Sequence, residues 1–240
     1  MSSEIEIIVL NGAFGMRNVS PFCLKLELLM KQLDIPHTYT EQSDPRKAPK
    51  GKFPYAIIDG VTYADSEVIT EKLDEVTQGA VYAGLTPAQK AHGLAMTRLA
   101  EEHLYWFIVG SRWLDDAWWP NVVDGFFQIA PALVRPLVAS GARRGVRQTL
   151  QLQGIGRHNH AEQEAFARRD LQALQDGIPD SGFLGGDKPR IHDFAVAGIM
   201  AGLLDNKPPT WLTPIGQEYT ALVEYTDRVQ ADMGIFGRHV

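Results

Sequence analysis

The sequence predicts a fold of two parts, in which a mixed α/β module precedes an all-helical domain. The first observation is a β-α-β-β-β-α order of patterns within residues 1–77. The second is the dipeptide Asp59-Gly60 between two β-rich runs, which is a strong hairpin signal. The third is that the patterned stretches after residue 86 have helical periodicity. Together they predict a four-stranded sheet of mixed strand directions, followed by a helical bundle.

The first three elements form a β-α-β unit. Residues 5–10 are an apolar run, typical of a strand that is buried on both faces. The next helix is expected to begin at Ser20-Pro21, because serine is a good N-cap and proline suits the first helical position. Ile35-Pro36 ends it, since proline cannot continue a helix. Residues 37–41 then alternate and predict a second strand.

The module closes with a hairpin and a short helix. Strands over residues 55–58 and 61–64 flank the Asp-Gly turn, and the helix opens at Asp65-Ser66. Residues 78–86 lack periodicity and are expected to be a linker, so the predicted domains are residues 1–77 and 87–240. Thr86 and Gln89 form a capping box that starts the second domain.

The second domain is predicted to contain helices over residues 87–111, 122–140, 146–153 and about 214–233, with a break at 154–156. A further helix starts at residue 191 and holds the most apolar run of the chain, which reads as a buried core helix. Four of the five tryptophans lie between residues 106 and 119. We expect most of them in the core and some to line an apolar pocket that faces the first domain. The candidate pocket residues are Phe14, Tyr105, Trp106 and Trp113.

Composition excludes several classes of protein. The chain has 240 residues, 45% apolar and 22% charged, and a net charge of −6, which argues against a general nucleic-acid binder. A single cysteine, Cys23, rules out an intrachain disulfide and indicates a reducing compartment, so we expect a cytoplasmic protein. We expect no signal peptide and no membrane span. His158 and His160 stand without acidic or cysteine partners at ligand spacing, so no metal site is predicted.

Four short motifs carry a family resemblance. Residues 20–23, Ser-Pro-Phe-Cys, are similar to the Cys-Pro-Tyr-Cys of glutaredoxins. Phe53-Pro54 stands where a cis-proline is expected, Asp65-Ser66 where an acidic-serine pair is expected, and Asp193 in the first turn of the buried helix. With the order of elements, nearly the whole chain resembles the glutathione transferase superfamily, whose first domain is thioredoxin-like. Residues 20–25 and 154–157 look most like the branch of failed axon connections proteins and metaxins.

One residue departs from the family pattern. The buried helix usually has Ser or Thr three residues before its aspartate, and this chain has Arg190 there. Asp193 can still accept a backbone N–H, but the reciprocal capping bond is expected to be lost, at a cost of ~1 kcal/mol.

The resemblance implies glutathione as a co-substrate and assigns its contacts. Phe53, beside Pro54, would pair with the peptide through its main chain, as an added strand does. Asp65 would bind the γ-glutamyl ammonium and Ser66 its carboxylate, although both could simply cap a helix. A cation must meet the glycyl carboxylate, and the candidates are Lys52, Lys50 and Arg46.

Ser20 is the predicted catalytic residue. Its hydroxyl would donate a hydrogen bond to the glutathione thiolate at a helix N-terminus, with help from Asn18 or Arg17. The alternative is that Ser20 only caps the helix through the N–H of Cys23. Cys23 itself lies one turn inside the helix and is interpreted as a packing residue.

Two functions follow from the resemblance. The first is a glutathione S-transferase that attacks a hydrophobic electrophile bound between the domains. The second is a non-catalytic binding or assembly protein of the metaxin or failed axon connections type. The superfamily also implies a homodimer.

Overall fold

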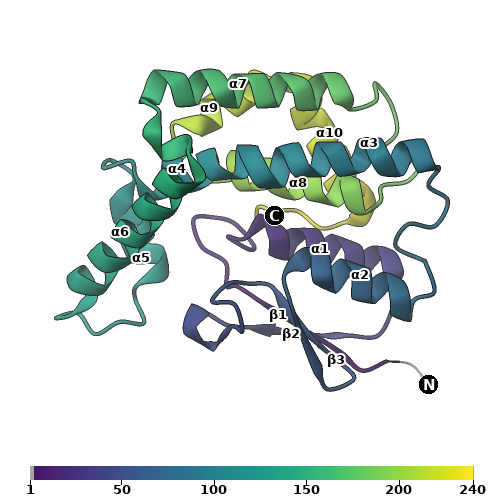
Figure 1. Ribbon diagram of the computed structural model, residues 1–240, viewed down its shortest axis with the longest axis horizontal. Coiled ribbons are helices and arrows are strands. Elements are labelled where there is room, and N and C mark those ends of the chain that lie inside the picture. Colours follow the sequence, from purple (N-terminus) through teal and green to yellow (C-terminus); the bar gives the residue numbers. More distant parts are fainter. Residues whose placement is uncertain (1–2, 240) are drawn as a thin grey trace.

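A four-stranded sheet in the order β2-β1-β3-β4 forms one side of the computed structural model, which describes residues 3–239 (Figure 1). The central strand β1 pairs in parallel with β2 and antiparallel with β3, and β3 pairs antiparallel with β4. The sheet is therefore mixed, as predicted. The strands are β1 (Ile5–Val9), β2 (Thr38–Glu41), β3 (Tyr55–Ile58) and β4 (Val61–Ala64), with a short 3₁₀ turn η1 (Pro45–Lys47) after β2.

The β3–β4 hairpin turns at the predicted dipeptide. Asp59 and Gly60 have φ angles of 50° and 78°, and Ile58 pairs with Val61 across the turn. Two successive positive φ angles are the signature of a type I′ turn, whose twist matches that of the strands. The turn residues thus set the register of β4 against β3.

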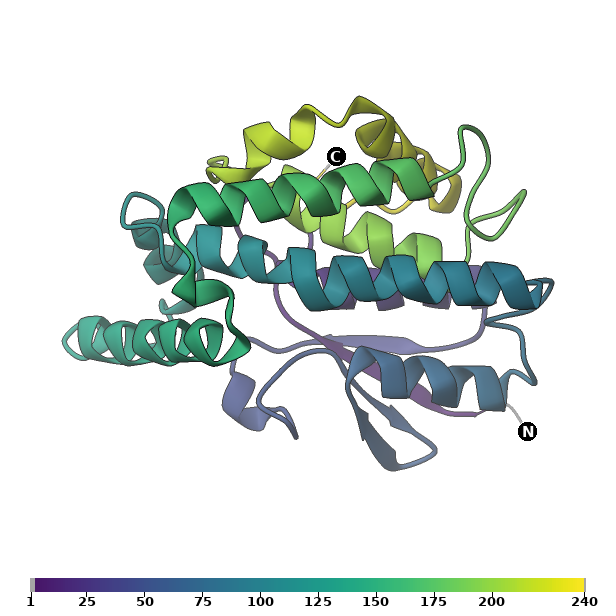
Figure 2. The same ribbon diagram turned by 45° about the horizontal axis from the view of Figure 1, so that its top comes forward.

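Helix α1 (Pro21–Leu33) lies between the sheet and the helical domain, and α2 (Ser66–Val76) lies on the same side of the sheet (Figures 1 and 2). Residues on nearly every side of α1 are buried between Pro21 and Met30, because it has neighbours on both sides. Its partner in the helical domain is α8 (Ile191–Leu204), where Gly198 permits a close approach. A Cβ atom on Gly198 would lie 2.8 Å from the carbonyl oxygen of Pro21.

The helical domain begins with one long helix that contains a local irregularity. It starts at the predicted capping box of Thr86 and Gln89 and consists of α3 (Pro87–Arg98), a π-helical segment η2 (Leu99–Leu104) and α4 (Tyr105–Trp113). The remaining elements are α5 (Trp119–Phe126), α6 (Arg135–Gln153), η3 (Ile155–Arg157), α7 (His160–Gly177), α8, α9 (Leu212–Gln217) and α10 (Thr220–Met233). Helix α8 is buried from residue 191 to residue 203, as its apolar sequence predicted.

Several predictions for this domain were wrong in detail. The helix expected over residues 122–140 is interrupted, because α5 ends at Phe126 and α6 begins only at Arg135. The helix expected over 214–233 is divided into α9 and α10. Helix α7 was not predicted, although Asn159 and Glu162 form a capping box at its start. Of the tryptophans between 106 and 119, Trp118 is buried and the other three are only half-buried.

Asp193 is held more firmly than the capping-box motif requires. Its Oδ2 accepts the N–H of Arg190 at 2.8 Å, and its Oδ1 accepts the N–H of Leu184 at 2.7 Å and the hydroxyl of Tyr225. The Arg190 side chain provides no capping bond, since a guanidinium has only donors. The Tyr225 and Leu184 contacts replace the missing reciprocal bond.

Within residues 3–239, no helix has both the length and the apolar content that crossing a membrane requires.

Candidate active site at one edge of the sheet

The strand register brings three distant chain segments to one edge of the sheet. Ile8, near the end of β1, pairs with Tyr55, and Tyr55 pairs with Ala64. Pro54 and Asp65 are the neighbours of these paired residues, so both lie at the edge where β1 ends. Helix α1 runs back along the sheet between parallel strands and therefore starts at this edge with Ser20. The structure thus brings Ser20, Pro54 and Asp65 to the same edge.

Ser20 precedes α1 in an extended conformation, with φ −95° and ψ 115°. Its N–H donates to Asn18 Oδ1 at 3.0 Å, and its carbonyl oxygen accepts the N–H of Cys23 at 3.1 Å. Within the described residues its hydroxyl makes no capping hydrogen bond to the helix. The interpretation of Ser20 as a plain side-chain cap is therefore wrong. The hydroxyl is half-buried at the positive end of the helix dipole.

Cys23 is fully buried, as predicted. Burial raises the pKa of its thiol to about 12, against smaller opposing effects from the backbone of Leu10 and the side chain of Ser20. A thiol with this pKa is protonated at neutral pH, so it is a poor nucleophile. Cys23 is a packing residue.

Asn18 and Arg17, the candidate helpers of Ser20, have different partners. Asn18 is buried and orients the Ser20 backbone through the bond described above. Arg17 is exposed, and its Nε donates to Glu27 Oε2 at 2.7 Å. Burial raises the pKa of Glu27, and Arg17 opposes that rise. Asn18 therefore supports the Ser20 loop directly, whereas Arg17 is paired with a carboxyl on α1.

The Phe53–Pro54 peptide bond is cis, as predicted. Phe53 is 9% exposed, and its ring stacks on that of Tyr55 with 6.0 Å between centroids. The side chain of Phe53 is therefore used in packing, which leaves its main chain as the part that can meet a ligand at the sheet edge.

Asp65 is the N-cap of α2. Its Oδ1 accepts the N–H of Glu67 at 2.9 Å, so the plain capping role holds for this residue. Its φ of 102° is rare for a residue with a side chain, and such backbone strain concentrates at functional sites. Ser66, the first residue of the helix, is buried. The exposed Asp65 carboxylate thus stands at a helix N-terminus, next to a buried serine.

The three candidate cations for the glycyl carboxylate differ in their surroundings. Arg46 donates twice to Asp44, at 2.8 and 2.7 Å, and holds the pKa of that carboxyl down at about 2. Lys50 and Lys52 are exposed, and Lys52 directly precedes Phe53. Arg46 is the least available of the three, because a ligand would have to compete with Asp44.

The predicted pocket residues fall into two aromatic groups. Phe14 and Trp113 both contact Phe126, with centroid distances of 5.1 and 5.7 Å. The Phe14 ring also lies against α5, since a Cβ atom on Gly125 would be 2.4 Å from it. Tyr105 instead packs on Phe22 of α1, at 4.9 Å, with Trp106 beside it. Phe126 was not predicted as part of this wall, because the sequence placed it inside a longer helix.

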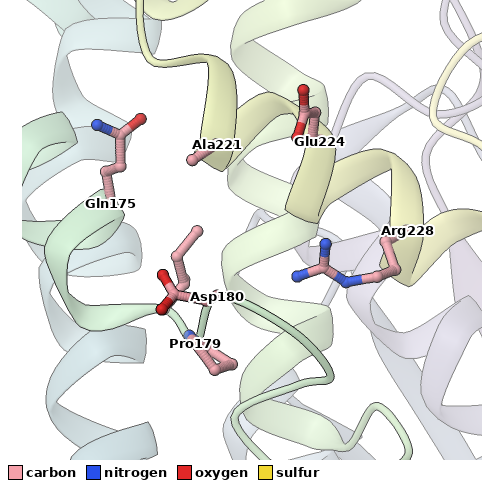
Figure 3. Close-up of a pocket in the computed structure, with 7 residues that line it drawn as sticks. Gln175, Pro179, Asp180, Ala221, Glu224 and Arg228 are labelled. Atoms are coloured by element: carbon pink, nitrogen blue, oxygen red, sulfur yellow. The ribbon is translucent and has the colours of Figure 1, made fainter.

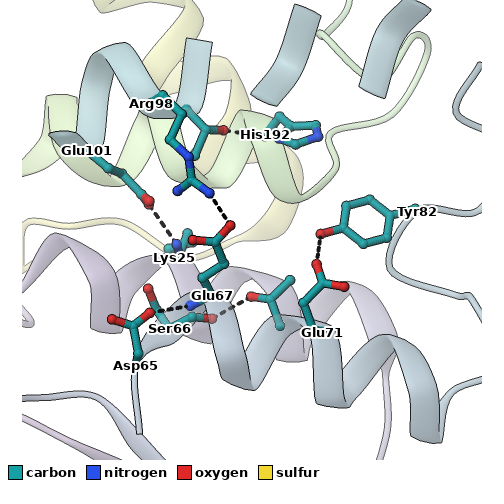
Figure 4. Close-up of polar contacts among 11 residues, drawn as sticks. Lys25, Asp65, Ser66, Glu67, Glu71, Tyr82, Arg98, Glu101 and His192 are labelled. Carbon is teal, nitrogen blue, oxygen red and sulfur yellow. Dashed lines mark hydrogen bonds and ion pairs between the residues drawn. The ribbon is translucent and has the colours of Figure 1, made fainter. Parts of the chain in front are cut away.

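Polar contacts between the domains lie beside this edge and were not predicted (Figure 4). Lys25 of α1 pairs with Glu101 of η2, and Arg98 of α3 pairs with Glu67 of α2. A lysine within the apolar run Leu24–Met30 is the signal that could have revealed the first pair. A third unpredicted residue, Arg112, is buried at the same interface.

A small pocket of about 100 Å³ lies elsewhere, between the C-terminal end of α7 and α10 (Figure 3). Asp180, Glu224 and Arg228 are among its lining residues. The chain passes from this region to the start of α8, whereas Pro21 contacts Gly202 near the end of α8. None of the residues that line this pocket belongs to the candidate site at the sheet edge. In the part of the chain that is described, no three His, Cys, Asp or Glu residues group as metal ligands would.

The four-stranded mixed sheet, the helical domain that follows it, and the meeting of Ser20, Pro54 and Asp65 at one edge of the sheet together define the architecture of glutathione transferases. A family model described as "Glutathione S-transferase N-terminal domain" matches residues 21–118. The isoprene-epoxide–glutathione S-transferase of Rhodococcus sp. (strain AD45) is 32% identical over 93% of this chain and 96% of its own length. The chain therefore belongs to the glutathione S-transferase family.

One further relative and one solved structure are also similar to this chain. Failed axon connections of Drosophila melanogaster is 27% identical over 78% of this chain and 47% of its own length. This match confirms the predicted resemblance to the failed axon connections branch. A glutathione S-transferase of Methylobacillus flagellatus, solved with GSH bound, shares the fold with a TM-score of 0.61 at 16% identity. The alignment covers 96% of this chain and 98% of that one.

Proposed function

We propose that the protein is a glutathione S-transferase in which Ser20 activates the glutathione thiol for attack on a small hydrophobic electrophile. The observation that supports this most is the meeting of Ser20, Pro54 and Asp65 at one sheet edge, where, among the described residues, the Ser20 hydroxyl makes no capping hydrogen bond to the backbone of α1.

Glutathione would bind along this edge in an extended form. The main chain of Phe53 would pair with its cysteinyl residue, as in the addition of a strand to a sheet. Asp65 Oδ2 would accept from the γ-glutamyl ammonium, while Ser66 and the N-terminus of α2 would bind the adjoining carboxylate. Lys52 is our choice for the glycyl carboxylate, because Arg46 is engaged with Asp44.

Ser20 would act on the sulfur atom alone. A free thiol titrates near 8.5, and a hydrogen bond to a charged group contributes ~1.5–3 kcal/mol, so the hydroxyl would lower the thiol pKa by roughly one to two units. The N-terminus of α1 adds to this effect. The thiolate then attacks the electrophilic carbon, a C–S bond forms, and the leaving atom departs with its electron pair.

The aromatic wall supports an apolar acceptor. Phe14, Trp113 and Phe126 join the loop before Ser20 to α4 and α5, so an apolar molecule between the domains would contact them. The name of the Rhodococcus relative makes a small epoxide the first electrophile to test. Opening of an epoxide ring breaks a C–O bond and yields an alkoxide that takes up a proton.

The alternative function is non-catalytic binding or assembly, and the match to Failed axon connections favours it. Retention on immobilised glutathione separates the two. We expect the wild-type protein to be retained and to be eluted by free glutathione; a protein that passes through unretained would favour the alternative.

The decisive experiment is a pH titration of the thiolate absorbance of bound glutathione, with S-methylglutathione as the blank. Ser20→Ala should raise the thiol pKa by roughly one to two units and cut turnover at neutral pH by about 10- to 100-fold, with little change in glutathione affinity. Ser181→Ala, at an exposed serine after α7, is the matched control. An unchanged thiol pKa in Ser20→Ala would remove Ser20 from the mechanism.

A homodimer remains part of the proposal. Exposed apolar residues near the start of α6 include Leu133, which is 98% exposed, and Leu137, which is 77% exposed, and they offer one face for association. A monomer mass by light scattering at micromolar concentration would reject the dimer.

A further inference from the structure

Arg112 of α4 is buried at the point where the helical domain meets the loop before Ser20. Its side chain is 6% exposed and makes hydrogen bonds through all three nitrogens. Nε donates to Asn206 Oδ1 at 2.9 Å, Nη1 to the carbonyl oxygen of Val19 at 3.2 Å, and Nη2 to the carbonyl oxygen of Gly202 at 2.5 Å. Nη2 also lies 3.7 Å from Met16 Sδ.

None of these partners carries a charge. Buried cations are ordinarily paired with a carboxylate, as the buried Lys25 of α1 is with Glu101. Arg112 has no carboxylate partner among residues 3–239. Burial lowers the pKa of its guanidinium to about 10, so the group is still a cation at neutral pH.

The guanidinium lies beside the backbone that leads into Ser20 and α1. It holds the carbonyl of Val19, the preceding residue. In addition, a Cβ atom on Gly202 would lie 3.8 Å from Arg112 Nη2 and 3.5 Å from Pro21 Cβ. The unpaired charge is therefore adjacent to the N-terminus of α1, where the helix dipole has the same sign.

We infer that Arg112 is a positioning residue of the thiolate site: it fixes the backbone on which Ser20 stands, and its unpaired charge favours the thiolate form of bound glutathione. This inference rests on the proposed function and adds to Ser20 a second source of thiol activation, supplied by the other domain.

Most of the remaining titratable groups around the first turns of α1 are neutral or paired. Burial raises the pKa values of Tyr105, Tyr39 and Cys23, which keeps all three neutral at pH 7. Among the carboxyls, Glu27 is paired with Arg17, Asp205 lies 3.6 Å from Arg238, and Glu41 accepts a hydrogen bond from the neutral amide of Asn11. Lys207, after Asn206, is exposed.

Three substitutions of Arg112 or its partner test the charge and the structural bonds. Arg112→Met keeps the length of the side chain but removes its charge and donors together. Asn206→Asp keeps an acceptor for Nε and places a negative charge beside it, so the field of Arg112 is cancelled while its bond to residue 206 is kept; the hydrogen bonds from Asn206 Nδ2 to the carbonyl oxygens of Gly202 and Leu203 are lost. Arg112→Lys keeps the positive charge but replaces the planar guanidinium, with its several hydrogen-bond donors, by an ammonium group. Arg228→Met is the matched control, because Arg228 also holds a backbone carbonyl, that of Gly182, but at the pocket of Figure 3.

The measurement is the thiol pKa of bound glutathione, together with the pH profile of kcat/KM. We expect Arg112→Met and Asn206→Asp each to raise the thiol pKa by about one unit, since a nearby opposite charge shifts a pKa by about 1–3 units. Turnover should then fall about tenfold at neutral pH and recover above the shifted pKa. Arg112→Lys should restore most of the wild-type pKa, and Arg228→Met should leave it unchanged.

The outcomes distinguish this inference from the proposed function. A wild-type protein that does not bind glutathione overturns both. A wild-type thiolate with a lowered pKa that Arg112→Met and Asn206→Asp leave unchanged overturns only the role of Arg112. A loss of turnover that is equal at every pH also overturns it, because a purely structural effect would look like this. If Arg112→Met does not fold, Asn206→Asp decides by the same pKa criterion.

Discussion

Lys25 and Glu101 form a buried ion pair between the two domains, with Nζ and Oε1 2.7 Å apart and side chains only 4% and 6% exposed. Lys25 comes from α1, the helix that carries Ser20 at its start, and Glu101 comes from the π-helical segment (Figure 4). Burial raises the pKa of Glu101, and the charge of Lys25 opposes that rise. The pair ties α1 to the helical domain.

Breaking this pair should cost much more stability than breaking an exposed one. Glu101→Gln leaves the Lys25 ammonium buried without an anion, which should lower the free energy of unfolding by about 3–5 kcal/mol. Urea unfolding measures it. Glu75→Gln is the control, because the Lys72–Glu75 pair has the same chemistry but Glu75 is 71% exposed; its cost should be under about 1 kcal/mol. Equal losses of unfolding free energy in the two variants would show that the buried pair contributes no more to stability than the exposed one.

His192 should make the protein acid-sensitive. Burial, helped by the charges of Lys25 and Arg98, lowers the pKa of His192 from 6.5 to about 4, and Nδ1 lies 3.0 Å from the hydroxyl of Thr97. Between these two values the imidazole is protonated in the unfolded chain and neutral in the folded chain. The free energy of unfolding therefore falls as the pH drops from about 6.5 to 4. The full effect is about 3 kcal/mol, from 1.36 kcal/mol per unit.

The matching variant is His192→Asn, which keeps a polar group near Thr97 but does not titrate. Urea midpoints of both proteins between pH 7 and 4 isolate this effect from the carboxyls that titrate in the same range. Parallel curves for the two proteins would exclude His192 as the cause.

Asp65 should govern affinity rather than thiol chemistry. Asp65→Asn keeps the cap on Glu67 and tolerates a positive φ, but it loses the charge for the γ-glutamyl ammonium. We expect glutathione to bind about tenfold more weakly or worse, with the thiol pKa nearly unchanged. Asp59→Asn is a matched control, because Asp59 also has a positive φ and bonds a backbone N–H, that of Glu4. Calorimetry gives the affinities; equal values for the two variants would remove Asp65 from the site.

Wild-type protein should be a poor thiol–disulfide reductase, and Ser20→Cys should gain this activity. Exchange needs a thiolate at the helix start, whereas the natural thiol of Cys23 is buried with a pKa of about 12. Ser20→Cys places the sulfur at the N-terminus of α1, which lowers a thiol pKa. The assay is reduction of a mixed disulfide of glutathione. The double variant Ser20→Cys/Cys23→Ala should keep the gained activity, and good reduction by the wild type would show that Cys23 is reachable.

The N-terminal module could be predicted because its signals are local. Asp59-Gly60 fixes a turn, Pro21 fixes the start of a helix, and short apolar or β-rich runs between these signals indicate the strands. Once the strands pair, their register places Pro54 and Asp65 together without any long-range information. The candidate site residues themselves were named from the family resemblance of their motifs, and the register explains why they lie at one edge.

The helical domain was harder, because its decisive contacts are between residues far apart in sequence. Glu101 and Lys25 are 76 residues apart, and the bond from Arg112 to Val19 spans 93. The gap at residues 127–134 carried a signal that the prediction overlooked, because Pro131 lies inside it and Pro136 stands in the first turn of α6, and proline is disfavoured inside a helix. Periodicity describes one face of a helix, and it does not say which charged residue on that face will find a partner.

The π-helical segment at Leu99–Leu104 has a consequence for the angular phase of the long helix. A π turn accommodates one residue more than an α turn, and one residue corresponds to about 100° of rotation in an α-helix. Everything from Tyr105 onward is therefore rotated relative to α3 compared with an uninterrupted helix. Because of this offset, the same long helix directs Glu101 at Lys25 and, further along, Arg112 at the loop before Ser20. A deletion of one residue inside the segment would remove the extra residue that the π turn accommodates, so the helix could become α-helical throughout while Arg112 kept its direction toward that loop.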